Sequence, residues 1–275
     1  MILNLAYPEK SEIPVKIFHF PDGEVQVELG QFSRKEEVIV WCRVTNAEEL
    51  FILLQTMDIL DRNGMPYDVH ITYLMGMRMD RVMDFNRPFT LKIVYDAIDN
   101  HTSSHFFKVL ELHSQRLWAF DKFLRWGNLY PDTNIRPDEE HYQIVYPDAG
   151  AAERYGAFED DVTCSKVRDS ETGKILELKI DNPELIEKDR DLLIKDDLCD
   201  GGGTFCGLAE AFNKLGIPKE RLNISVIHMV NRKGIENLSK CFNHVFITNS
   251  YKDWDNLPDN VTMYDVFAND YEIQK

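Results

Sequence analysis

The chain has 275 residues, of which 44% are hydrophobic, enough for two domains that each bury a core. Its 31 basic and 47 acidic residues give a net charge of −16, which argues against duplex nucleic acid or an anionic membrane as a partner. Its five cysteines lack metal-ligand spacing, and no apolar run approaches membrane-spanning length. We therefore expect a protein of the reducing cytoplasm.

Apolar periodicity predicts strands that alternate with helices. In the first half we expect strand 37–44, helix 47–62, strand 69–75, helix 89–98 and strand 106–112. In the second half we expect strands 142–146 and 192–195, helix 204–215, strand 223–229, helix 234–241 and strand 245–248. Such alternation is typical of parallel sheets covered by helices, so the predicted fold class is α/β, in two related units.

Two irregular stretches suggest the domain organisation. Glycine, proline and aspartate cluster without periodicity between residues 126 and 140, so we expect the boundary there, with domains 1–130 and 131–275. Residues 161–183 hold Ser170-Glu-Thr-Gly173 between apolar runs, which predicts a β-hairpin flap. The packing of the polar and aromatic residues 263–275 is not predicted.

The most informative stretch is 191–204, where an apolar strand runs into acids, three glycines and a predicted helix. A helix N-terminus with a glycine-rich turn can accept a phosphate, and carboxylates at a strand end suit ribose hydroxyls or a metal. A sugar phosphate is the ligand that this combination favours, over an ordinary turn with solvated acids. The candidate ribose-phosphate residues are Asp196, Asp197, Asp200, Gly201, Gly202, Gly203 and Thr204.

This segment resembles the ribose-phosphate loop of two families, the phosphoribosyltransferases and the ribose-phosphate pyrophosphokinases (PRPP synthetases). Phe20-Pro-Asp22-Gly-Glu24 is similar to the nucleotide loop of the pyrophosphokinases, although Asp-Gly alone would indicate a hairpin turn. Arg78-Met-Asp80-Arg81 is similar to that family's Arg-Gln-Asp-Arg segment. The resemblance assigns ATP binding to Phe20, Asp22, Glu24, Arg78 and Asp80; a solvated basic loop is the alternative for the arginines.

Three further motifs favour the pyrophosphokinases. Glu111-Leu-His113-Ser-Gln115 and Pro147-Asp148-Ala-Gly150 resemble segments that hold the Mg²⁺ of Mg·ATP, which assigns the metal to His113 and Asp148. Lys166-Val-Arg168 is similar to the Lys-x-Arg of the family's catalytic flexible loop. Two cations on alternate flap residues could both face the charge that develops around the β-phosphorus, so Lys166 and Arg168 are the expected catalytic residues.

The motifs follow one another in the family's order over residues 20–204. The resemblance implies two phosphoribosyltransferase-like (Rossmann-like) domains: 1–130 binds the nucleotide, and 131–275, with the catalytic flap 161–183, binds the ribose phosphate. It also implies Mg²⁺-dependent transfer of the β,γ-diphosphate of ATP to the anomeric hydroxyl of a ribosyl phosphate, with release of AMP. The expected assembly is a homo-oligomer that binds neither nucleic acid nor membrane.

The resemblance is incomplete at the loop, where Gly201 replaces a threonine whose hydroxyl would bind a terminal phosphate. Two acceptors therefore stay open. Ribose 5-phosphate would give PRPP, and ADP-ribose, whose phosphodiester needs fewer donors and more room, would give ADP-ribose pyrophosphate for NAD synthesis. Two other classes also stay open, a phosphoribosyltransferase and an inactive regulatory subunit.

Overall fold

The structure is a computed structural model that describes residues 1–33, 35–82, 84–100, 106–113, 126–129, 136–168 and 175–268, the side chains of residues 167–168 and 175–177 excepted. The chain divides into two compact units, Met1–Tyr130 (unit 1) and Pro131–Lys275 (unit 2). Within the described residues, no helix is both long and apolar enough to cross a bilayer.

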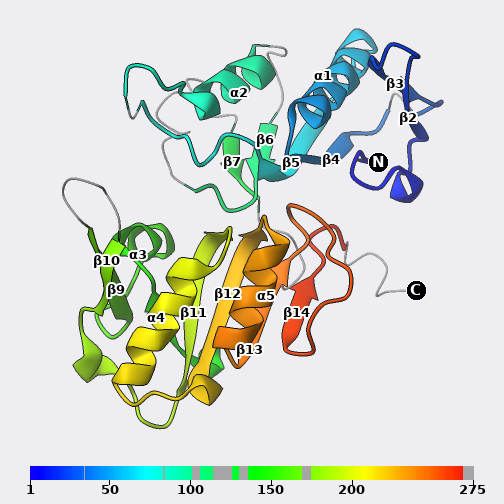
Figure 1. Ribbon diagram of the computed structural model, residues 1–275. Helices are drawn as coiled ribbons and strands as arrows, with labels where there is room; N and C mark the ends of the chain where they lie inside the picture. The colour runs from blue at the N-terminus through cyan, green and yellow to red at the C-terminus, as the bar shows by residue number, and fades with distance from the viewer. Residues whose placement is uncertain are drawn as a thin grey trace. The chain divides into compact units, whose positions relative to one another are not determined.

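Unit 1 is built on a sheet in which every strand runs parallel to its neighbours (Figure 1). In sheet order, its strands are β1 (Ile2–Asn4), β4 (Val38–Val44), β5 (Tyr67–Leu74), β6 (Phe106–Val109) and β7 (Trp126–Asn128). The helices of this unit are α1 (Ala47–Arg62) and α2 (Thr90–Asp99), with a 3-10 turn at Pro8–Lys10. Valines and aromatic residues dominate the strands because they fill a half-buried pleated surface well.

A separate antiparallel hairpin in unit 1 consists of β2 (Val15–His19) and β3 (Val25–Leu29). It packs on α1 through a small apolar cluster of Val25, Val27 and Ile52. The Gln55 side chain strengthens the contact, because its amide nitrogen Nε2 donates to the Val25 carbonyl at 2.9 Å. The hairpin tip, residues 20–24, is thereby attached to the sheet through α1.

Unit 2 is built on a larger sheet that is parallel except for one edge strand (Figure 1). In sheet order, its strands are β10 (Ile175–Ile180), β9 (Val162–Arg168), β8 (Tyr142–Tyr146), β11 (Asp191–Cys199), β12 (Leu222–Met229), β13 (His244–Thr248) and β14 (Val261–Tyr264). The helices are α3 (Ala149–Tyr155), α4 (Gly203–Lys214) and α5 (Arg232–Cys241), with 3-10 turns at Glu139–His141, Pro183–Leu185 and Lys219–Arg221. β12 is buried along its whole length, as a central parallel strand must be.

The predicted α/β class with parallel sheets is confirmed, and the predicted helix 47–62 coincides with α1. The structure also corrects several sequence-based boundaries. The strand expected over 192–195 runs on through the acids to Cys199, because β12 pairs with it along that whole length. The stretch 126–140 contains a strand, β7, and α3 and β14 were not predicted. α3 is short, and β14 becomes a strand by pairing with β13.

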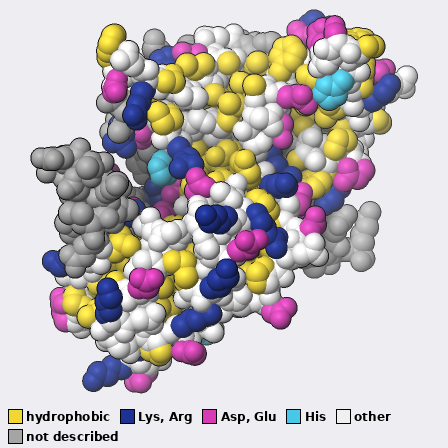
Figure 2. Space-filling model, in the orientation of Figure 1, with side chains coloured by type: hydrophobic (Ala, Val, Ile, Leu, Met, Phe, Trp, Pro, Cys, Tyr) yellow, Lys and Arg dark blue, Asp and Glu magenta, His cyan; other side chains and the backbone are white. Residues whose placement is uncertain are grey.

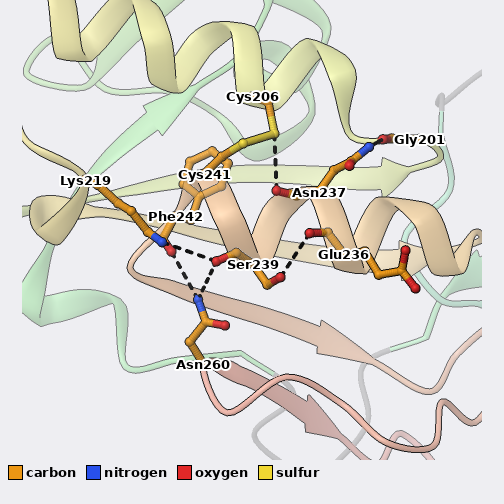
Figure 3. The surroundings of a disulfide bond; sticks show 9 residues. All are labelled: Gly201, Cys206, Lys219, Glu236, Asn237, Ser239, Cys241, Phe242 and Asn260. Atoms are coloured by element: carbon orange, nitrogen blue, oxygen red, sulfur yellow. Dashed lines mark hydrogen bonds between the residues drawn. A yellow bond between two sulfur atoms is a disulfide. The ribbon is translucent and has the colours of Figure 1, made fainter.

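α4 and α5 lie side by side on one face of the unit 2 sheet, and a disulfide joins them (Figure 1, Figure 3). Cys206 near the start of α4 is bonded to Cys241 at the end of α5, and the two Cα atoms are 5.5 Å apart. Cys42, Cys164 and Cys199 are free and buried. A disulfide is unusual in the reducing cytoplasm that the sequence led us to expect. The two cysteines are 35 positions apart, so no local sequence pattern predicts that they pair.

Candidate functional site

The candidate ribose-phosphate loop connects the carboxyl end of β11 to the first turn of α4. Gly202 is the N-cap of α4 and has φ +74°, a left-handed conformation that glycine adopts without strain. A Cβ atom placed on Gly201 or Gly203 would meet no described atom within 4 Å, so both glycines border open space. The first amides of α4 have no partner within the helix. The structure therefore places open space beside the N-terminus of α4, and the binding of a phosphate there stays a prediction.

The two acids before this loop are held by one arginine from α3. Arg154 Nη1 lies 3.1 Å from Asp196 Oδ1 and 2.8 Å from Asp197 Oδ1. The side chains of Arg154 and Asp196 are each 13% exposed and that of Asp197 is 2% exposed, so water screens these ion pairs weakly. Sequence reasoning missed Arg154, which lies 42 residues before Asp196.

Burial and mutual repulsion decide the ionisation of this group. Burial and the charge of Asp197 raise the pKa of Asp196 to about 8, although Arg154 opposes the shift. Burial also disfavours the charged guanidinium, but Asp197 and Asp196 outweigh it and raise the pKa of Arg154. The group therefore consists of one permanent cation and two crowded carboxyl groups, of which Asp196 keeps its proton up to about pH 8.

The predicted catalytic lysine contacts the predicted metal ligand. Lys166 on β9 places its Nζ 2.5 Å from Asp148 Oδ2, and Asp148 is also the N-cap of α3, accepting from the Ala151 N–H at 3.0 Å. Burial alone would raise the pKa of Asp148, but the hydrogen bond and charge of Lys166 outweigh it and lower the pKa below its ordinary value. The charge of Asp148 also contributes to the raised pKa of Asp196, so the two acids are near one another. The side chain of Arg168 lies outside the described residues.

In unit 1, the candidate nucleotide residues Phe20, Asp22 and Glu24 form the tip of the β2–β3 hairpin. Gly23 has φ +92°, and the Asp22 carboxylate accepts from the Glu24 N–H at 3.1 Å, so the stretch is a hairpin turn. The ring of Phe20 is an exposed aromatic surface, with 47% of the residue accessible, and lies edge-on to Phe18. The structure is compatible with both interpretations of this motif: residues 20–24 form a hairpin turn, and the exposed ring of Phe20 is accessible for stacking on a nucleotide base.

The remaining unit 1 candidates lie after β5 and β6. Arg78 is exposed, whereas Asp80 is buried and pairs with Arg81 at 2.9 Å between Nε and Oδ1. His113 is half-buried, two residues after Glu111, whose φ is +43°. His113 belongs to unit 1 and Asp148 to unit 2, so the pairing of these two metal candidates stays a prediction.

Magnesium would find suitable ligand atoms in unit 2. Within the described residues, no group of three or more histidine, cysteine or acidic side chains is arranged to hold a metal ion by itself. Mg²⁺ prefers carboxylate oxygens and keeps much of its water, so it needs only one or two protein ligands. Asp148, with 34% of its side chain exposed and an ionised carboxylate favoured by Lys166, has the chemistry for that role.

The charged surface agrees with small, local sites for anions. On the face shown in Figure 2, lysine and arginine side chains alternate with aspartate and glutamate instead of gathering by sign. A phosphate on this face would therefore be bound by local groups such as loop amides and a few placed cations.

Known proteins similar to this chain include ribose-phosphate pyrophosphokinases. A ribose-phosphate pyrophosphokinase of Pyrococcus furiosus is 28% identical over 257 residues, 88% of each chain, and one of Sulfurisphaera tokodaii is 26% identical over 221 residues, 74% of each chain. The crystal structure of phosphoribosylpyrophosphate synthetase from Mycobacterium smegmatis has a TM-score of 0.72 at 18% identity and covers 94% of this chain and 88% of its own, which shows a shared fold. No protein-family model matches the chain.

Proposed function

We propose that this chain, which belongs to the ribose-phosphate pyrophosphokinase family and is a diphosphokinase-type transferase, moves the β,γ-diphosphate of ATP to the anomeric hydroxyl of a ribosyl phosphate. The anomeric oxygen attacks the β-phosphorus, the bond from that phosphorus to the oxygen bridging the α-phosphate breaks, AMP leaves with that oxygen, and the hydroxyl proton passes to solvent.

The observation that carries the proposal is the arrangement of acids, loop and flap within unit 2. Asp196 and Asp197 directly precede the loop of residues 200–204, where a phosphate would meet the N-terminal amides of α4. Carboxylates in this position would accept hydrogen bonds from ribose hydroxyls. Lys166, beside Asp148, would place its charge on the transferring diphosphate.

Magnesium and the nucleotide complete the proposal. When bound, Mg²⁺ supplies positive charge that neutralises the polyphosphate, and Asp148 and His113 are the residues that would hold it. Phe20, Asp22, Glu24, Arg78 and Asp80 of unit 1 would bind ATP. Following the family resemblance, we propose a homo-oligomer, which sedimentation velocity would detect.

The assay that tests the function measures AMP released from ATP in the presence of Mg²⁺ and a ribosyl phosphate. Release of AMP with formation of the sugar diphosphate is the expected result. A protein that instead consumes PRPP together with a nucleobase, and releases no AMP from ATP, would be a phosphoribosyltransferase.

The same assay, run with ribose 5-phosphate and with ADP-ribose, decides the acceptor. Gly201→Thr adds a hydroxyl in a place where its Cβ meets no described atom within 4 Å, so the variant should fold normally. If ADP-ribose is the acceptor, the added side chain crowds its substituted phosphate and lowers that activity, while activity on ribose 5-phosphate holds or rises. A wild-type protein that is fast on ribose 5-phosphate and inert to ADP-ribose would rule out the larger acceptor.

A further inference from the structure

The ribose-phosphate loop has unusual conformational freedom in its own sequence. Gly201, Gly202 and Gly203 are consecutive, and each glycine has more backbone freedom to lose on folding than any other residue. A loop of this kind binds a phosphate well only if something outside it selects one conformation.

The first feature that holds the loop is a close backbone contact with α5. A Cβ atom on Gly234 would lie 2.1 Å from the carbonyl oxygen of Asp200, far inside contact distance, so only glycine allows this approach. From the other side, a Cβ atom on Gly202 would lie 3.3 Å from the Gly234 carbonyl oxygen. α5 and the loop therefore touch backbone to backbone, and the helix acts as a support for the loop.

Two asparagines, one that caps α5 and one within it, add polar contacts to this support. Asn231, the N-cap of α5, donates from Nδ2 to Asp200 Oδ1 at 3.0 Å, while its Oδ1 accepts from the Lys233 N–H at 3.0 Å. Asn237 Nδ2 donates to the Gly201 carbonyl at 2.8 Å, and Figure 3 shows its side chain pointing toward that residue. Asn237 lies three positions after Gly234, the spacing of neighbours on one helix face.

The contact of Asn237 is the one that fixes a peptide of the loop itself. A peptide group is planar and trans, so holding the Gly201 carbonyl toward α5 also orients the Gly202 N–H in the opposite direction. The next carbonyl, that of Gly202, accepts from the Cys206 N–H at 3.0 Å and begins α4.

We propose that Asn237 is a positioning residue for the acceptor: through its hydrogen bond to the Gly201 carbonyl it keeps the glycine loop in the conformation that binds the phosphate of the ribosyl substrate. This inference rests on the proposed function for the identity of the ligand. The ordering of the loop by Asn237 is independent of the proposed function and can be measured without substrate.

The test compares variants that remove this hydrogen bond with variants that leave it intact. Asn237→Asp keeps the size of the side chain but cannot donate to a carbonyl, and Asn237→Ala favours the helix, so its folding is protected. Asn213→Asp makes the same chemical change at an exposed position of α4. Cys241→Ser breaks the link between α4 and α5 but leaves Asn237 in place.

In both Asn237 variants we expect the acceptor KM to rise about two- to tenfold, the range that one neutral hydrogen bond supplies, with the ATP KM and kcat nearly unchanged. Without substrate, hydrogen exchange at the amides of residues 201–204 should be faster in these variants and unchanged in Asn213→Asp. The exchange result stands even if no ribosyl phosphate is turned over, an outcome that would refute the proposed function alone.

Unchanged loop exchange in both Asn237 variants would overturn the positioning role. So would a rise in acceptor KM and loop exchange of the same size in Cys241→Ser, because the effect would then belong to the placement of the whole helix. A fall in kcat together with a higher ATP KM would assign Asn237 to general folding of the unit.

Discussion

The loop after β11 in unit 2 and the loop after β5 in unit 1 both connect the carboxyl end of a parallel strand to the start of a helix, but they differ in length and in what holds them. The unit 2 loop has only residues 200–202 between β11 and α4, whereas the unit 1 loop extends over residues 75–89 before α2. Each contains a glycine with positive φ, Gly202 at +74° and Gly76 at +84°. Gly76 lies against the start of its own helix, near Thr90, and Gly202 against α5, a helix later in the sequence.

The charges near the two loops differ as well. In unit 2, Arg154 is 13% exposed and pairs with two largely buried carboxylates, whereas in unit 1 Arg81 is 52% exposed and pairs with the buried Asp80. The short loop is thus surrounded by groups that tertiary contacts hold in place, and the long loop presents cations to solvent. If the two loops bind the ligands proposed for them, the sugar-phosphate loop would be organised before its ligand binds, whereas the exposed arginines of the other loop would take their final positions on binding.

The largest expected effect is the loss of Arg154. Arg154→Met leaves two crowded carboxylates without their cation and should destabilise unit 2 by about 3–5 kcal/mol, the usual cost of breaking a buried ion pair. Arg81→Met removes an arginine whose side chain is half exposed and should cost under about 1 kcal/mol. Urea unfolding measures both, and hydrogen exchange of β11 and β5 assigns each change to its unit. Equal losses of unfolding free energy in the two variants would show that the buried and the exposed arginine contribute equally, contrary to the difference proposed between the two loops.

The next effect concerns catalysis. Lys166→Ala should lower kcat by about two orders of magnitude with little change in the KM for ATP, because the lysine charge meets the transition state more than the ground state. Lys179→Ala, on the opposite strand of the same hairpin, where the residue is exposed, is the matched control. Near-normal turnover of Lys166→Ala in steady-state kinetics would show that the ion pair between Lys166 and Asp148 is structural and not catalytic.

A smaller effect is expected on the magnesium requirement. His113→Ala in unit 1 and Asp148→Ala in unit 2 should each raise the Mg²⁺ concentration at half-maximal activity by about tenfold, because both are assigned to one metal–nucleotide site. The exposed Asp160→Ala is the control. Titrations at fixed ATP in which both midpoints stay at the wild-type value would remove the metal role from these residues.

The stability of unit 2 should also depend on pH. The pKa of Asp196 is about 8 in the folded protein, because burial and Asp197 raise it, and an unfolded aspartate titrates near about 4. The folded state therefore binds the extra proton over this interval, so the stabilisation is complete below about pH 4 and is lost as the pH rises through about 8.

Asp196→Asn cannot ionise, so the Tm of this variant should fall less than that of the wild type between pH 5 and pH 8, by a difference of about ten degrees, since each pH unit in this interval corresponds to about 1.4 kcal/mol. Scanning calorimetry at several pH values measures the slope, and Asp160→Asn, an exposed change of the same kind, should leave it unaltered. Parallel slopes for the wild type and Asp196→Asn would show that Arg154 already compensates the burial of this acid.

Sequence patterns were informative wherever structure depends on neighbours along the chain. The apolar spacing of residues 47–62 predicted α1, and glycines after a strand predicted the turn into α4. The same patterns misjudged the end of β11 at Lys195, because acids are uncommon inside strands and only pairing with β12 extends the strand to Cys199. α3 was not predicted because its seven residues are too few to show a clear helical periodicity.

The sequence by itself determined the α/β class, the order of the motifs and the residues of the glycine loop, since each depends on local propensity and spacing. Only the tertiary structure decided the partners of that loop. Arg154 meets Asp196 across 42 residues, Asn237 meets Gly201 across 36, and Cys206 meets Cys241 across 35. Parallel strands bring together chain segments that are far apart in sequence, and periodicity holds no information about which side chains then come into contact.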